Sequence, residues 1–120
     1  MGNTVKIRLF HDGVTIGYAM RPSSGSALIV GPEPEEYVKY VNDDGTYYRI
    51  YGTEEYLAQS GADHEYTIGR ATFDGATTFE IKDDGSFTSG ETGKRITYKK
   101  EDSRLYASGE FLEVTAKLRT

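Results

Sequence analysis

The sequence predicts an all-β protein, because apolar and polar residues alternate with a period of two along most of the chain. Four Asp-Gly pairs separate the alternating segments, and Asp-Gly is a strong signal for a tight hairpin turn. The chain also has 14 glycines and three prolines, a balance that suits many short elements joined by turns. We therefore expect roughly ten strands, in a single domain that covers residues 1–120.

An antiparallel hairpin is expected at the start of the chain. Apolar and polar side chains alternate over residues 5–9 and again over 14–20, and His11-Asp12-Gly13 supplies the turn between them. A polar loop over residues 21–26 follows. The continuous apolar run 27–30 then predicts a strand that is buried on both faces.

Three more Asp-Gly turns organise the middle of the chain, and each is flanked by β-branched or aromatic residues. The predicted antiparallel pairs are 37–41 with 46–51, 66–73 with 77–81, and 77–81 with 86–88.

One helical turn and three C-terminal strands complete the expected elements. The helical segment is Thr53–Gln59, with Thr53 as the N-cap and two glutamates in the first turn. Residues 95–99, 104–107 and 112–118 are predicted strands, and the last of them has the most regular alternation.

Consecutive strands joined by short turns predict an antiparallel meander, and closure into a barrel would remove its exposed edges. A two-sheet β-sandwich is the first alternative. A β-trefoil is the second, because Asp43-Asp44-Gly45 recurs as Asp83-Asp84-Gly85, 85 − 45 = 40 residues later, and 120 residues divide into three such units. The flanking residues differ, however, and no third copy stands at residues 3–5.

The composition excludes several classes of function. The chain has 14 basic and 19 acidic residues, a net charge of −5, which argues against nucleic-acid binding. It has no cysteine, and hence no disulfide or thiolate zinc site. No apolar run approaches the ~18 residues of a membrane span. Without a signal peptide or cysteines, we favour a cytoplasmic location.

Tyrosine marks the candidate binding site. Seven of the ten tyrosines fall within residues 37–66, mainly in the hairpin over 37–51. Tyrosine offers a rigid apolar ring and one hydroxyl, which suits recognition of a protein or a glycan. Tyr47 and Tyr48 are adjacent in a strand, so one of them must face outward. The predicted contact residues are Tyr37, Tyr40, Tyr47, Tyr48, Tyr51 and Arg49.

No catalytic residue, metal ligand or cofactor is predicted. His11 and His64 lack metal-ligand spacing and are expected to be solvent-exposed. The two Asp-Asp-Gly triplets are expected to form turns, because neither continues into a calcium-binding loop. Two acidic clusters and one basic cluster are expected to be solvated surface charges. They are Glu33, Glu35 and Glu36; Glu54 and Glu55; and Lys94, Arg95, Lys99, Lys100 and Arg104.

The favoured function is a non-enzymatic recognition module that binds a protein or glycan partner through the tyrosine-rich hairpin. The acidic balance favours a basic partner. The alternative is a carrier that encloses a small hydrophobic ligand in a barrel. Its expected inward residues are Ile16, Tyr18, Ile50, Ile68, Phe79, Ile96 and Val114. An enzyme is disfavoured, because no convergent acid–base pair is visible.

Overall fold

Thirteen strands make up most of the computed structural model, which describes residues 4–60, 66–108 and 110–120. In chain order they are β1 (Thr4–His11), β2 (Val14–Met20), β3 (Ile29–Gly31), β4 (Glu36–Asn42), β5 (Gly45–Ile50), β6 (Tyr56–Ser60), β7 (Tyr66–Ala71), β8 (Phe79–Ile81), β9 (Phe87–Ser89), β10 (Thr97–Lys99), β11 (Arg104–Tyr106), β12 (Leu112–Glu113) and β13 (Thr115–Arg119). One 3₁₀ turn, η2 (Phe73–Gly75), stands between β7 and β8. The all-β prediction is confirmed.

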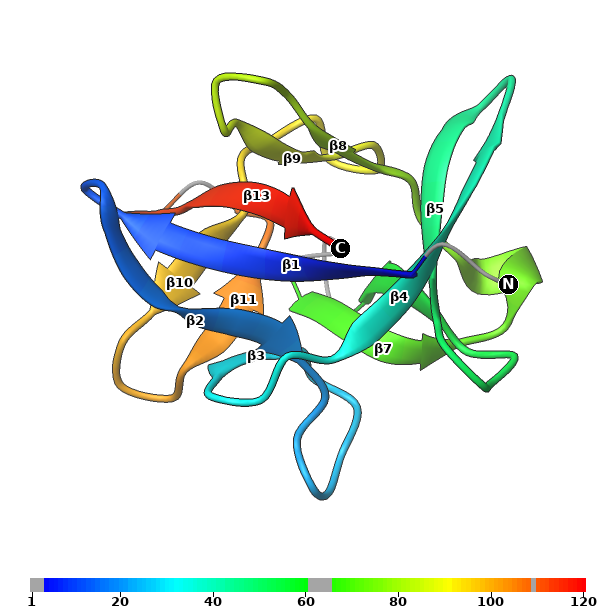
Figure 1. Cartoon of the computed structure of the whole chain (residues 1–120), viewed down its shortest axis with the longest axis horizontal. Coiled ribbons are helices and arrows are strands. Elements are labelled where there is room, and N and C mark those ends of the chain that lie inside the picture. Colours follow the sequence, from blue (N-terminus) through cyan, green and yellow to red (C-terminus); the bar gives the residue numbers. More distant parts are fainter. Residues whose placement is uncertain (1–3, 61–65, 109) are drawn as a thin grey trace.

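Every strand pair in the described residues is antiparallel. The pairs form an 11-stranded sheet and a separate β8–β9 sheet, and neither closes into a barrel. The connections are not those of a simple meander, because β1 pairs with β4 and β13 as well as with β2. In Figure 1, β1 and β13 run side by side through the middle of the view. The first and last strands of the described chain are thus paired with each other.

Three of the four expected Asp-Gly hairpins are confirmed: β1–β2, β4–β5 and β8–β9. Asp12 and Gly13 both have positive φ, 50° and 81°, as a tight hairpin turn between right-twisted strands requires. Side chains brace the other two turns, because the backbone N–H of Asp44 donates to the Asn42 side-chain oxygen and that of Ser86 to Asp84. The acidic triplets are therefore turns, as expected.

Two sequence-based expectations in the middle of the chain are wrong. Residues 74–75 lie in η2 and not in a hairpin, and β7 pairs with β6 in place of 77–81. The expected helix over 53–59 is absent, since its second half is strand β6. The reason is burial: Leu57, Ala58 and Gln59 are all buried in a bulged strand. Ala58 and Gln59 pair with β7, and the Leu57 carbonyl accepts a hydrogen bond from the Thr77 N–H.

The apolar run 27–30 is buried on one face and not on both. Leu28 and Val30 are buried, whereas Ala27 and Ile29 are only half-buried. The strand predicted over 112–118 is divided at Val114 into β12 and β13, although Val114 and Ala116 are buried and Glu113 and Lys117 are exposed, as the alternation predicts.

One apolar core occupies the centre of the described residues, and three of its residues are evenly spaced in the sequence. Leu9, Tyr48 and Phe87 are all buried there and stand 39 residues apart (48 − 9 and 87 − 48). They lie in β1, β5 and β9, the strands that begin each third of the chain. The radius of gyration of 12.7 Å is close to the ~13.6 Å typical of one compact domain of this length.

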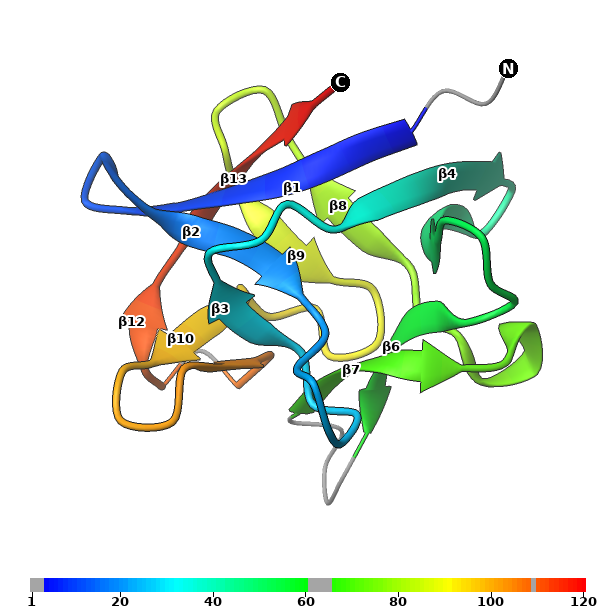
Figure 2. The ribbon, with the colours of Figure 1, turned by 60° about the horizontal axis from the view of Figure 1, so that its bottom comes forward.

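Three hairpin pairs, β2–β3, β6–β7 and β10–β11, meet one another through backbone hydrogen bonds. The Leu28 N–H donates to the Thr67 carbonyl at 2.7 Å, and the Leu105 N–H donates to the Leu28 carbonyl at 3.1 Å. Figure 2 shows β3, β7 and β10 on the lower side of the molecule and β1 and β4 on the upper side. The three hairpins thus share one end of the fold.

Gly17 in β2 provides a test of this packing. Its φ is +139°, and a β-carbon there would lie 2.6 Å from the Gly31 carbonyl oxygen. We expect Gly17→Ala to lower the free energy of unfolding by at least about 2 kcal/mol. Gly13→Ala is the matched control, because Gly13 also has positive φ but opens into free space; it should cost about 1 kcal/mol. Equal losses in urea denaturation would contradict the close approach of β2 and β3.

Candidate functional site

The register of the β4–β5 hairpin divides its tyrosines between two faces. Tyr40 stands directly opposite Tyr47, and Tyr37 stands opposite Ile50. Because successive side chains alternate, Tyr37 and Tyr48 share the inward face, whereas Tyr40 and Tyr47 share the outward face. The expectation that one of Tyr47 and Tyr48 faces outward is confirmed, and the outward residue is Tyr47.

Tyr37 and Tyr48 are core residues, with exposed fractions of 0% and 2%. Their rings meet edge to face, with centroids 6.4 Å apart, and the Tyr37 hydroxyl donates to the Ala19 carbonyl at 2.7 Å. Burial raises the pKa of Tyr48 to about 12 and that of Tyr37 well above its usual value. Because both rings are buried, neither can touch a binding partner, and Tyr37 and Tyr48 are removed from the predicted contact set.

Four rings form a cluster on the outward side, which we call the aromatic face: Tyr40, Tyr47, Tyr56 and Phe73. Phe73 lies at its centre, with ring centroids 5.7 Å from Tyr40, 5.1 Å from Tyr47 and 5.3 Å from Tyr56. Tyr40 is 47% exposed and Phe73 is 44% exposed. The cluster joins β4, β5 and β6 with the η2 turn.

Sequence reasoning missed Tyr56 and Phe73. The helix predicted over 53–59 includes Tyr56, whereas in β6 Tyr56 stands opposite Arg49 and so shares that residue's face. Phe73 was placed at the end of a strand, whereas the η2 turn carries it over the hairpin. The dense tyrosine sequence was a signal for the first residue, but no local pattern marked the second.

The two remaining predicted contacts lie beside the aromatic face or away from it. Arg49 is half-buried, and its guanidinium donates to the Thr53 carbonyl at 2.6 Å. Tyr51 is 58% exposed and lines a separate surface hollow that also contains Arg21 and Glu35. Tyr51 is therefore a surface ring that does not belong to the cluster in the described structure.

Acidic groups border the aromatic face. The Tyr47 hydroxyl lies 3.4 Å from Oδ2 of Asp44, to which it donates. Partial burial, followed by the negative charge of Asp44, raises the pKa of Tyr47. Asp74 follows Phe73 directly and is exposed. Asp44 thus places a negative charge at the edge of the cluster.

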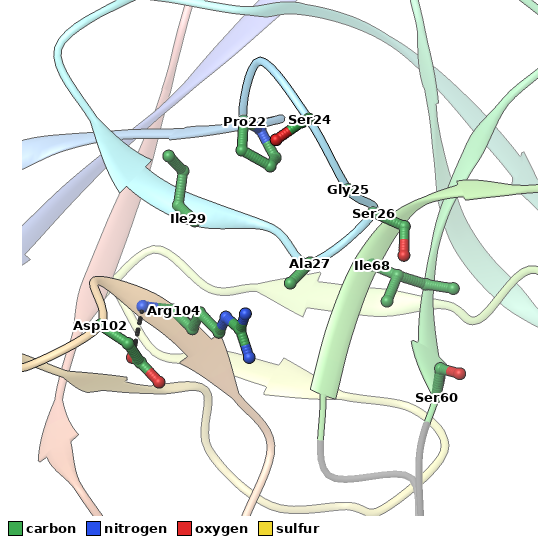
Figure 3. Close-up of a pocket in the computed structure, with 10 residues that line it drawn as sticks. All are labelled: Pro22, Ser24, Gly25, Ser26, Ala27, Ile29, Ser60, Ile68, Asp102 and Arg104. Atoms are coloured by element: carbon green, nitrogen blue, oxygen red, sulfur yellow. Dashed lines mark hydrogen bonds between the residues drawn. The ribbon is translucent and has the colours of Figure 1, made fainter.

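A surface pocket of about 580 Å³ lies where the three hairpins meet (Figure 3). Its walls combine apolar side chains, serine hydroxyls, one acidic residue and one basic residue. The lining residues are Pro22, Ser24, Gly25, Ser26, Ala27, Ile29, Ser60, Ile68, Asp102 and Arg104. Of the carrier's expected inward residues, Ile68 alone lines this pocket, whereas Ile50, Phe79, Ile96 and Val114 lie in the central core.

An ion-pair network stands next to this pocket. Arg21 donates to both carboxylate oxygens of Glu35, at 3.2 Å each, and to Glu55 at 2.7 Å. Arg70 also donates to Glu55, at 3.3 Å, and to the Gly25 carbonyl at 3.0 Å. Hydrogen bonding to Glu35 raises the pKa of Arg21 despite the opposing effect of burial. The expectation that Glu35 and Glu55 are freely solvated is therefore wrong, because both carboxylates form ion pairs.

The other candidate groups have structural partners. The Nδ1 atom of His11 lies 2.8 Å from the Glu113 carbonyl oxygen, and its Nε2 lies 3.3 Å from Asp12. In the basic cluster, Arg95 donates to the Val114 carbonyl and pairs with Glu113 at 3.3 Å. His64 lies outside the described residues.

The described residues hold neither a metal-binding cluster nor a membrane-spanning helix. It contains no group of three or more His, Cys, Asp or Glu side chains that could hold a metal ion. It also contains no helix long and apolar enough to cross a membrane.

The raised pKa values of the buried tyrosines make the free energy of unfolding fall as the pH rises in the alkaline range. Because the unfolded chain loses the Tyr48 proton near pH 10 and the folded protein near pH 12, this group's contribution is complete below pH 10 and is lost as pH rises to 12. We expect a loss of about 2–3 kcal/mol from Tyr48, and Tyr48→Phe should remove that part of the slope. Tyr51→Phe, at an exposed ring, is the control. Equal slopes in urea unfolding at pH 9–12 for Tyr48→Phe and the wild type would contradict the burial of Tyr48.

Comparison with known proteins supplies no further guide to the site. No family model, no curated protein and no solved structure matches the chain. Its function must therefore be argued from the geometry described above.

Proposed function

We propose that this chain is a non-enzymatic recognition module that binds a protein partner through its aromatic face. The observation that carries the proposal is the packing of Tyr40, Tyr47 and Tyr56 around Phe73 at the surface. Exposed aromatic clusters are costly to leave in water and are enriched at the centres of protein interfaces. These rings are also stiff, so that little conformational entropy is lost when a partner covers them.

The arrangement of the rings favours a protein over a glycan. The ring planes of Tyr40 and Phe73 meet at 78°, and those of Tyr56 and Phe73 at 58°. The cluster is therefore an uneven apolar mound and not a flat platform on which a sugar ring would stack. A partner with an apolar pocket fits it better.

The charge at the edge of the cluster favours a basic partner. Asp44 lies against Tyr47, the exposed Asp74 follows Phe73 in the chain, and the chain as a whole carries a net charge of −5. Complementary charge at the rim of an interface speeds association and selects against acidic competitors. Arg49 is the nearby cation, and its guanidinium is already engaged by Thr53. We infer that the partner presents lysine or arginine around an apolar centre.

We further infer that the fold is a β-trefoil, in which six strands form a barrel capped by the three hairpins. Four of the required contacts are ladders: β1–β4, β4–β5, β8–β9 and β13–β1. A bridge between Ser86 and Thr115 supports the fifth, between β9 and β13. At the sixth, β5 lies against β8 without a ladder.

Variants of the aromatic face test the proposed function. The double variant Tyr40→Ser/Phe73→Ser removes two exposed rings, and Tyr51→Ser/Val14→Ser is the matched control at exposed positions outside the cluster. Proteins captured from a lysate on each immobilised variant would be compared by quantitative mass spectrometry. Each purified candidate partner would then be titrated by calorimetry.

We expect a basic protein whose affinity falls at least tenfold in the aromatic-face variant and changes less than twofold in the control. Both variants should remain folded, with stability lowered by about 1 kcal/mol per cross-strand pair removed. Captured proteins whose affinity is the same for both variants would contradict the proposal. Binding on a glycan array that requires Tyr40 and Phe73 would replace the protein partner with a glycan.

A further inference from the structure

The pocket at the junction of the three hairpins is built from two cross-strand pairs. Ile29 in β3 stands opposite Arg104 in β11, and Ala27 stands opposite Ile68 in β7. Directly opposed residues project from the same face of a sheet, so both pairs contribute side chains to one wall. Figure 3 shows the Arg104 side chain extending from β11 toward β7 and the segment that precedes β3.

The loop that forms the rim of the pocket is held in place. The Gly69 N–H donates to the Ser26 carbonyl at 3.0 Å, and the Arg70 guanidinium donates to the Gly25 carbonyl at 3.0 Å. At the start of the loop, the backbone N–H and the side chain of Arg21 both donate to Glu35. A pocket with a fixed rim loses little free energy to ordering when a ligand enters.

Arg104 supplies the charge that is free to act on a ligand. In the described residues its backbone N–H donates to Asp102 at 2.9 Å, but no hydrogen bond or ion pair engages its guanidinium. Asp102 is occupied, because it also accepts a hydrogen bond of 2.8 Å from the Tyr106 hydroxyl. Burial raises the pKa of Asp102, but these two hydrogen bonds, together with the positive charges of Lys99 and Arg104, lower the pKa overall.

The remaining lining is apolar or neutral. Pro22, Ala27, Ile29 and Ile68 provide hydrocarbon surface, and Ser24 and Ser26 place hydroxyl groups at the rim. A volume of about 580 Å³ lies in the range of pockets that take one small organic molecule. An exposed cation beside apolar side chains matches a ligand with one acidic group and an apolar body, because guanidinium and carboxylate form two parallel hydrogen bonds.

We propose that this pocket is a binding site for a small organic carboxylate with an apolar body, whose acid group is held by Arg104. The ligand's apolar part lies against Ile29 and Ile68, and its charge lies on the side of Arg104 away from Asp102, where repulsion between the two carboxylates is least. This site shares no residue with the aromatic face, so the inference does not depend on the proposed function.

The test is a titration of the isotope-labelled full chain with 2-naphthoate, followed by amide chemical shifts, with 2-naphthamide as the neutral analogue of the same shape. We expect saturable shifts at Gly25, Ala27, Ile68 and Arg104, and affinity for the amide at least tenfold weaker. Arg104→Gln should weaken naphthoate binding at least tenfold, and Arg104→Lys, which keeps the charge but loses the two-pronged geometry, should weaken it less. Arg119→Gln is the matched control, because it removes the same charge from an exposed position in β13.

Three results would overturn the proposal. The first is the absence of saturable shifts at the pocket residues. The second is equal affinity for naphthoate and naphthamide, which would show that the apolar walls bind without the cation. The third is equal loss of binding in Arg104→Gln and Arg119→Gln, which would show a general effect of net charge.

Discussion

The hydrogen bond from the Tyr37 hydroxyl to the Ala19 carbonyl ties β4 to β2 and fixes which face of the β4–β5 hairpin is buried. With Tyr37 held at zero exposure, the two-residue period of the strands places Tyr48 beside it in the core. The same period turns Tyr40 and Tyr47 outward, where they meet Phe73. A slip of one residue would exchange the two sets, which would expose two core rings and bury two rim hydroxyls.

At the other end of the fold, pairing between distant segments determines which side chains line the pocket. The pocket takes its walls from segments near residues 27, 68 and 104, which the hairpin contacts bring together. The pairs formed by Arg21 and Arg70 with Glu35 and Glu55 cross between the first and second hairpins and hold the pocket rim. Because these charges are partly buried and converge on Glu55, they contribute more to a fixed geometry than isolated surface pairs do.

The sequence predicted those features that depend on neighbouring residues. Asp12-Gly13 and Asp84-Gly85 formed their hairpins because the turn chemistry is local. Asp74-Gly75 did not form a hairpin, because β7 pairs with β6 and these two residues lie in the η2 turn. Likewise, the glutamates expected in the first turn of a helix did not determine the structure of this segment, because strand β6 buries Leu57 in the core.

In the candidate sites, too, the sequence predicted what depends on neighbouring residues but not what depends on tertiary contacts. Alternation alone showed that Tyr47 and Tyr48 must face opposite ways, but which one faces outward depends on the tertiary contact of Tyr37. Phe73 joined the aromatic face, and Arg104 joined the pocket, through contacts between elements that are distant in the chain. No local sequence pattern carries that information.

Solvent access to the individual tyrosine rings tests this account most directly. Photochemically induced nuclear polarisation with a flavin dye enhances the signals of tyrosines whose rings the dye can reach. The structure predicts strong enhancement for Tyr40 and Tyr51 and none for Tyr37 and Tyr48. Enhancement of Tyr37 or Tyr48, with Tyr40 silent, would mean that the hairpin presents its other face, and would contradict the aromatic face as the recognition surface.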